Sequence, residues 1–137
     1  MITGINHITF AVADLERSLR FYRDTLGCAE VYAWSGGAYL DAGGTWLCLS
    51  VDASASGNSD YTHVAFDVAP EDFKTLSARV IESGAELWKD NVSEGDSLYF
   101  CCPDGHRLEV HVGDLQSRLA AITSRWQRAG CGSASSS

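Results

Sequence analysis

The sequence lacks an excess of positive charge and any long apolar run. Its 137 residues carry 10 lysines and arginines against 18 aspartates and glutamates, for a formal net charge of -8. A nucleic-acid or anionic-membrane partner needs a basic surface, so the composition argues against both. The first ten residues, MITGINHITF, have neither a basic start nor a long apolar segment. We therefore expect no signal peptide and no transmembrane helix, and a cytoplasmic protein.

Cysteine pairs at metal-binding spacing are absent as well. The five cysteines are odd in number and include no CxxC pair, which argues against a zinc knuckle or a disulfide framework. The length suits one domain, residues 1–137. The small polar residues of 129–137 predict a disordered tail.

An internal repeat organises the rest of the chain. The segment that begins at His7, HITFAVADLERSLRFYRDTLG, is echoed 56 positions later from His63 as HVAFDVAPEDFKTLSARVIESG. Each copy reads as a strand, an amphipathic helix and a glycine, with Asp14 as N-cap of the first helix and Pro70 at the start of the second. Three short strands, separated by turn residues, follow each helix.

These elements predict an α+β fold built from two βαβββ modules. The first module covers about residues 1–52 and the second about 61–112, and the polar segment 53–60 is the hinge between them. A C-terminal helix is predicted over 114–128. The strands of each module should form a cupped mixed sheet with the helices on its apolar face.

Polar side chains recur on the opposite face of the predicted strands. In RLEVHV, residues 107–112, alternation separates Arg107, Glu109 and His111 from an apolar row. Aligning the two copies makes Cys48 the counterpart of Glu109. A solvated charged strand face would explain one such row, but the repetition predicts a concave surface that holds a ligand.

Two histidines and one glutamate on this face predict a metal site. His7 and His63 take corresponding positions in the two copies, and Glu109 lies in the second. Two imidazoles and one carboxylate leave coordination positions open. A strand histidine taken alone is more often structural, so the prediction depends on the repeat. Cys48 stays open as a soft fourth ligand.

The combined motifs resemble a known family. GxNHxTxAVxDL at the start, GAYL, WLCLS, SDYTHVAF, KDNxSEG and PDGHRLEVHVGxLxxRLA together resemble the fosfomycin-resistance glutathione transferases of the vicinal-oxygen-chelate superfamily, over residues 1 to about 123. The resemblance implies homodimers with shared sites, in which His7 comes from one subunit and His63 with Glu109 from the other. It also implies Mn2+ or another divalent metal, activation by K+, and inactivation of fosfomycin by addition of the glutathione thiol to its epoxide.

The same resemblance implies roles for further residues. Thr9 would hydrogen-bond the epoxide oxygen, and Tyr39 would lie beside the incoming thiol, where we expect it to assist deprotonation. The fosfomycin site would include Trp46, Lys89, Ser93, Ser97, Tyr99 and Arg118. The K+ loop would include Asn91, Ser93, Gly95 and Ser97. The thiol substrate would contact Trp34, Ser50 and Lys89.

Other functions stay open at this point. Addition of water would need a carboxylate base, and the relevant turn offers only Asp41. Another thiol could replace glutathione, because Gly36 and Val92 stand where some relatives carry polar side chains. A lactoylglutathione lyase would need a second acid where Cys48 stands, and an iron extradiol dioxygenase would leave the cations near the site idle. A metal-free drug-sequestering protein could share the fold but would not need the triad.

Overall fold

The computed structural model describes residues 1–129, with side chains to residue 125. The elements of the first module are β1 (His7–Val12), α1 (Leu15–Leu19), η1 (Arg20–Thr25), β2 (Ala29–Trp34), β3 (Gly37–Ala42) and β4 (Thr45–Val51). Asp14 caps α1, as predicted, and its carboxylate accepts from the backbone N–H of Arg17 at 3.1 Å. The helix widens into π geometry over η1 and has Leu26 as its C-cap. Gly27 follows the cap, and its φ of +82° suits a residue without Cβ.

The second module repeats this order. Its elements are β5 (Val64–Asp67), η2 (Pro70–Asp72), α2 (Phe73–Glu82), β6 (Leu87–Lys89), β7 (Ser97–Cys101) and β8 (Arg107–His111). The strand β5 begins one residue after His63. A C-terminal helix, α3 (Leu115–Ala129), follows. Apart from Ala129, the predicted disordered tail lies outside the described residues.

Each module forms a mixed four-stranded sheet, in the order β1-β4-β3-β2 and β5-β8-β7-β6. The first strand pairs in parallel with the fourth in both, so that Thr9 lies opposite Cys48 and Ala65 lies opposite Glu109. The predicted correspondence between Cys48 and Glu109 is therefore present in the strand register. Within residues 1–129, β1, β2, β5 and β6 are edge strands, each with a strand neighbour on one side only.

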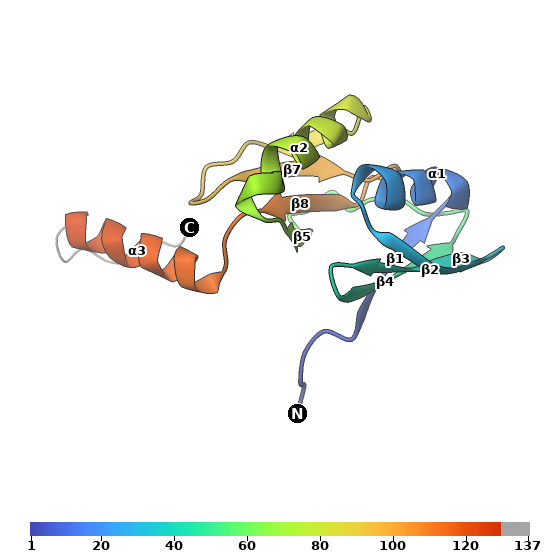
Figure 1. Cartoon of the computed structure of the whole chain (residues 1–137), viewed down its shortest axis with the longest axis horizontal. Helices are drawn as coiled ribbons and strands as arrows, with labels where there is room; N and C mark the ends of the chain where they lie inside the picture. Colours follow the sequence, from blue (N-terminus) through green and yellow to red (C-terminus); the bar gives the residue numbers. More distant parts are fainter. Residues whose placement is uncertain (130–137) are drawn as a thin grey trace.

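The apolar strand faces pack beneath the helices. Figure 1 shows α1 and α2 on the same side of the two sheets, while α3 leads away from them. Both modules contribute to one core, where Phe21 of the first lies 6.0 Å from Phe100 of the second, between ring centroids. Burial of these rows is the main stabilising contribution, and it leaves the opposite faces for polar side chains. No helix within the described residues is long and apolar enough to span a bilayer.

Candidate metal centre

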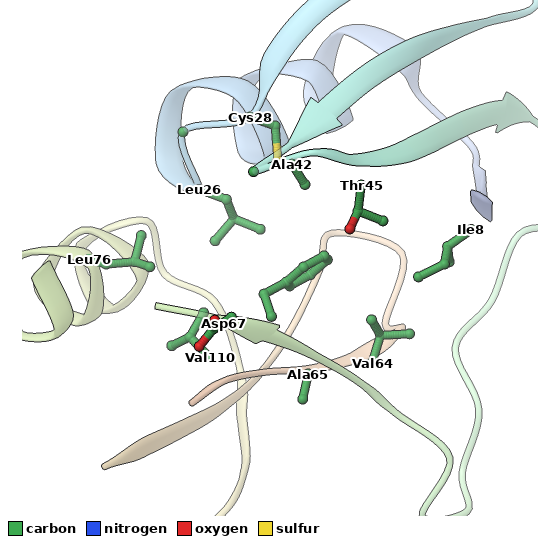
Figure 2. A pocket seen from close by; sticks show the side chains of 13 residues that line it. Ile8, Leu26, Cys28, Ala42, Thr45, Val64, Ala65, Asp67, Leu76 and Val110 are labelled. Atoms are coloured by element: carbon green, nitrogen blue, oxygen red, sulfur yellow. The ribbon is translucent and has the colours of Figure 1, made fainter. Parts of the chain in front are cut away.

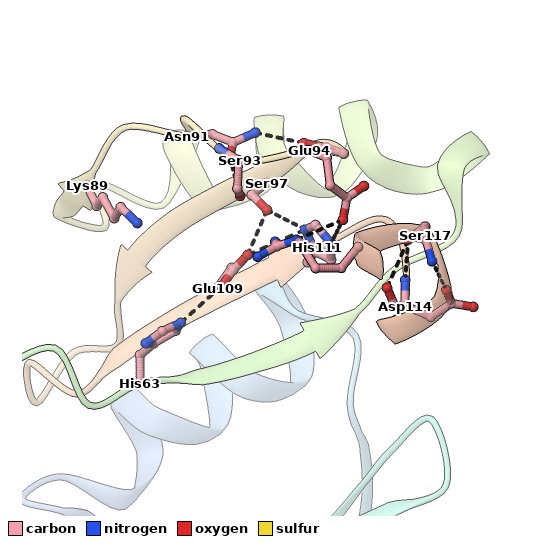
Figure 3. A network of polar contacts seen from close by, with 12 residues as sticks. His63, Lys89, Asn91, Ser93, Glu94, Ser97, Glu109, His111, Asp114 and Ser117 are labelled. Atoms are coloured by element: carbon pink, nitrogen blue, oxygen red, sulfur yellow. Dashed lines mark hydrogen bonds and ion pairs between the residues drawn. The ribbon is translucent and has the colours of Figure 1, made fainter. Parts of the chain in front are cut away.

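His63 and Glu109 face each other across the second sheet (Figure 3). Nε2 of His63 lies 3.1 Å from Oε1 of Glu109, and Glu109 is buried, with only 6% of the residue exposed. Nδ1 of His63 lies 2.8 Å from the carbonyl oxygen of Tyr61. A carbonyl only accepts, so Nδ1 carries the hydrogen, and in the neutral ring Nε2 presents its lone pair to the carboxylate. The lone pair of the His63 nitrogen and the lone pair of the Glu109 oxygen repel each other unless a proton or a cation lies between them.

A chain of polar contacts fixes the other oxygen of Glu109. Ser97 Oγ donates to Glu109 Oε2 at 2.7 Å and lies 2.6 Å from Nδ1 of His111. Because the hydroxyl gives its one hydrogen to the carboxylate, it accepts from His111. Nε2 of His111 lies 3.8 Å from Oε1 of Glu94, to which Arg118 Nε donates at 3.1 Å. The chain thus runs from Glu109 to the C-terminal helix (Figure 3).

His111 and Glu94 were not predicted as site residues. Alternation along β8 put His111 on the face of Glu109 and was a signal for it. Glu94 lies within the KDNxSEG motif of the predicted K+ loop, but its pairing with His111 and Arg118 could not be predicted, because these partners lie on other elements. Arg118 was predicted to hold a phosphonate, and in this structure its partner is a carboxylate.

Lys89 supplies positive charge on the same sheet. Its Nζ hydrogen-bonds the hydroxyl of Tyr61 and lies 4.7 and 4.8 Å from the ring centroids of Tyr61 and Tyr99. The hydrogen bond to Tyr61 raises the pKa of the Lys89 ammonium. Tyr99 is buried and lies opposite Glu109 in the strand register. Tyr61, two residues before His63, was also not predicted.

The loop between β6 and β7 closes on itself. Oδ1 of Asn91 accepts from the backbone N–H of Ser93 at 3.1 Å and from its hydroxyl at 3.2 Å. The Asn91 amide donates to the carbonyl oxygen of Gly95 at 2.8 Å. Gly95 has a φ of +77°, the left-handed region that glycine adopts without strain. These contacts hold the predicted K+ loop as a turn before Ser97.

The first module presents His7 beside a row of aromatic rings. The His7 ring lies 4.5 Å from Trp46, Trp46 lies 5.3 Å from Tyr39, and Tyr39 lies 5.0 Å from Trp34, measured between centroids. Nδ1 of His7 lies 2.7 Å from Oδ1 of Asn6, so this ring also keeps Nε2 for another partner. The other predicted residues of this sheet, Thr9 and Ser50, are exposed on β1 and β4.

One chain brings together only part of the predicted triad. Within residues 1–129, no three histidine, cysteine, aspartate or glutamate side chains gather as a metal site. His63 and Glu109 meet on the second sheet, whereas His7 belongs to the first. The candidate centre of a single chain is therefore a half-site with one nitrogen donor and one oxygen donor.

The comparisons with known proteins agree with this fold. Residues 4–110 match the Glyoxalase/Bleomycin resistance protein/Dioxygenase superfamily. The chain belongs to this superfamily. It is 50% identical over 125 residues to the glutathione transferase FosA of Serratia marcescens. The aligned region covers 88% of this chain and 89% of that protein. It is 36% identical over 127 residues to the metallothiol transferase FosB of Shouchella clausii strain KSM-K16. That alignment covers 88% of this chain and 87% of the FosB protein.

A solved superfamily member shares the architecture. The fosfomycin resistance protein FosX of Listeria monocytogenes, solved in complex with Mn(II) and sulfate, is 30% identical and has a TM-score of 0.76, covering 88% of this chain and 98% of that chain. The superfamily recognised from the sequence motifs, and the α+β fold of two βαβββ modules, are therefore confirmed.

Asp41 and a cavity between the modules contribute no ligand to the candidate metal centre. Oδ1 of Asp41 accepts from the backbone N–H of Gly44 at 2.7 Å, so this carboxylate stabilises the β3–β4 turn. A cavity of about 530 Å³ lies between the modules on their apolar side, and none of the predicted site residues lines it (Figure 2). Its walls include Ile8, Leu26, Val64, Phe66, Leu76 and Val110.

Proposed function

We propose that this protein is an enzyme that adds the thiol of glutathione to the epoxide of fosfomycin and so inactivates the antibiotic. The observation that carries the proposal is the approach of His63 Nε2 to Glu109 Oε1, at 3.1 Å, on the polar face of a chain 50% identical to a glutathione transferase FosA. A buried carboxylate directed at an imidazole lone pair is half of a metal site.

The donor set fits a divalent ion such as Mn2+. His63 and Glu109 would hold it together with His7, because both histidines use Nδ1 for a local oxygen and keep Nε2 for coordination. When bound, the ion supplies Lewis acidity toward the epoxide oxygen. Support for manganese comes from the FosX of Listeria monocytogenes, whose structure contains Mn(II).

A homodimer would complete the site. His7 of one subunit would join His63 and Glu109 of the other, since the single chain separates them. Like β2 and β6, β1 and β5 are edge strands, and an edge strand presents backbone donors and acceptors that a second chain can use, apart from the Ala11 carbonyl oxygen, which His106 contacts. His7 opens β1, and His63 directly precedes β5.

The chain's own residues would orient fosfomycin. Thr9 shares a strand face with His7 and would donate a hydrogen bond to the epoxide oxygen as the carbon–oxygen bond breaks. Lys89 and Arg118 would supply charge-assisted hydrogen bonds to the phosphonate. Arg118 already pairs with Glu94, so phosphonate binding there would exchange one anionic partner for another. The remaining contacts would come from Trp46, Ser93, Ser97 and Tyr99.

Glutathione would bring its own nucleophile to the first module. Its sulfur attacks one epoxide carbon, the carbon–oxygen pair of electrons moves to oxygen, and that oxygen takes up a proton. Tyr39 would stabilise the thiolate, and Trp34, Ser50 and Lys89 would contact the rest of the tripeptide. Thiols are kept reduced in the cytosol, where we expect the enzyme to act.

K+ would act through the loop that precedes β7. The proposed loop residues are Asn91, Ser93, Gly95 and Ser97. A cation bound there would order the segment that places the Ser97 hydroxyl on Glu109. Potassium dependence is therefore expected in the rate of the reaction.

Phosphorus NMR tests the proposed reaction. Purified protein is incubated with fosfomycin, Mn2+ and K+, with glutathione, L-cysteine or no thiol, and a parallel set contains excess EDTA. We expect a new phosphonate resonance with glutathione, and none in the EDTA set. Product without thiol would indicate a hydrolase, and faster product with cysteine would indicate another thiol. Tightly bound but unreacted drug in every tube would indicate sequestration.

A further inference from the structure

Asp104 is a buried carboxylate that joins the two modules. It lies in the β7–β8 turn of the second module, and its side chain is 1% exposed. Oδ1 accepts from the backbone N–H of Ala13 at 2.9 Å and from Arg17 Nη2 at 3.1 Å, and Oδ2 accepts from Ser18 Oγ at 3.3 Å. All three donors belong to the first module, where β1 passes into α1. A carboxylate this deeply buried depends on these donors, because removing them leaves a desolvated charge.

His106, two residues after Asp104, also contacts the first module, at strand β1. Its Nε2 lies 2.8 Å from the carbonyl oxygen of Ala11 in β1, so Nε2 donates. Its ring lies 5.7 Å from that of Phe10, the preceding residue of β1. Gly105, between the two side chains, packs against the backbone of Gly57 so closely that a Cβ on Gly57 would lie 1.7 Å from the Gly105 carbonyl oxygen. The linker between the modules is thus held at the same place.

This contact, here called the Asp104–His106 joint, connects both half-sites. On one side it holds Ala11 and Ala13, which follow His7 and Thr9 on or just after β1. On the other side His106 leads directly into β8, the strand of Glu109. Since β1 has only β4 as a strand neighbour within residues 1–129, the joint is a second restraint on this edge strand.

We propose that Asp104 and His106 are positioning residues that set the place of β1, and with it His7 and Thr9, relative to the strand of Glu109. The proposal rests on the proposed function for what the site does. In a homodimer with shared sites, His7 and Glu109 of one chain serve different cups. The joint of each chain would then connect the two metal sites of the dimer. Weakening it would loosen His7, which binds the metal together with His63 and Glu109 of the partner subunit.

The test compares Asp104→Asn and His106→Gln with a matched control. Asp104→Asn keeps the side-chain shape but removes the charge, and His106→Gln is the milder variant if the first does not fold. Arg79→Gln is the control, because Arg79 also joins the modules, donating to the carbonyl oxygen of Thr25 at 2.6 Å without touching β1. Thermal unfolding should show a loss of stability in all three variants.

Two readouts separate positioning from stability alone. In the metal-free protein, hydrogen exchange in residues 7–14 should be faster in the joint variants than in Arg79→Gln. Mn2+ affinity, measured by electron paramagnetic resonance of the free ion, should fall roughly tenfold in the joint variants and stay unchanged in the control. Equal exchange and equal Mn2+ affinity in all variants would overturn the proposal. Neither readout uses fosfomycin, so failure of the proposed reaction would be recognised separately.

Discussion

The hydroxyl of Ser97 donates to Oε2 of Glu109 at 2.7 Å, while the other carboxylate oxygen faces His63 at 3.1 Å. One oxygen of Glu109 is thereby fixed by a neighbour on β7, and the other is left for a cation. A ligand oriented in this way loses less conformational entropy when the metal binds, and hydrogen bonds of this kind commonly contribute to metal affinity.

Ser97→Ala should therefore weaken Mn2+ binding. The substitution removes the donor to Glu109 and the acceptor for His111, and we expect Mn2+ affinity to fall roughly tenfold, as for other residues that orient metal ligands. Ser54→Ala is the control, because the exposed Ser54 hydroxyl, in the linker, donates to Asp52 at the end of the first module. Titration by electron paramagnetic resonance checks both variants. A change confined to K+ activation would show that Ser97 does not act through Glu109.

Arg118→Gln should weaken fosfomycin binding. Removing the guanidinium takes away a charge-assisted hydrogen bond to the phosphonate, and we expect KM for fosfomycin to rise roughly tenfold or more, with a smaller change in kcat. Lys74→Gln removes the same charge from an exposed position of α2 and should leave KM unchanged. Steady-state kinetics at fixed ionic strength measure the difference. An equal effect of the two substitutions would assign it to net charge instead.

Three buried thiols should be slow to react. Burial raises the pKa of Cys28 to about 11 and also raises the pKa of Cys101 and Cys102. A raised pKa keeps the thiol protonated, so at pH 8 roughly one Cys28 in a thousand is the reactive thiolate. Half-buried Cys48 should be labelled first by iodoacetamide in a Cys131→Ser background. Mass spectrometry of the labelled peptides gives the order.

The pH dependence of labelling provides a second check on these thiols. The rate at Cys28 should rise about tenfold per pH unit until the pH approaches its pKa. A flat rate, or labelling of Cys28 as fast as that of Cys48 at neutral pH, would contradict the burial seen in the structure.

Tyr39→Phe should slow thiol addition. The substitution removes only the hydroxyl, so the ring contacts with Trp34 and Trp46 remain possible. We expect kcat/KM for glutathione to fall by roughly 10- to 100-fold and its pH profile to move toward higher pH, because the thiolate loses a hydrogen bond. Tyr32→Phe, at an exposed ring of the same row, is the control. An unchanged rate and profile would remove Tyr39 from the mechanism.

The fold could be predicted from the sequence because its signals are local. Alternation with period two separates the rows that contain Glu109 and Leu108, and the helical pattern after Asp14 marks α1. The repeat then gave the correspondence between Cys48 and Glu109, which the strand register contains. Patterns of this kind depend on neighbours a few residues away and need no knowledge of the rest of the chain.

Contacts between distant segments could not be predicted in the same way. Alternation shows which face a side chain takes, but not which remote group it meets. The pairing of Arg118 with Glu94, the contact of Asp104 with Ala13, and the bonds from Arg79 to the end of η1 all join separate elements. The roles given to the site residues by resemblance remain predictions.

Mixed dimers test the division of the metal site between two subunits most directly. His7→Ala and Glu109→Gln should each abolish activity as homodimers, since each removes one ligand from both cups. The two variants are co-expressed with different affinity tags and purified as a heterodimer. One metal site of this heterodimer has all three ligands, and the other lacks both His7 and Glu109. The account predicts about half of the wild-type activity per dimer, with one Mn2+ bound. A folded heterodimer without activity or bound Mn2+ would contradict it.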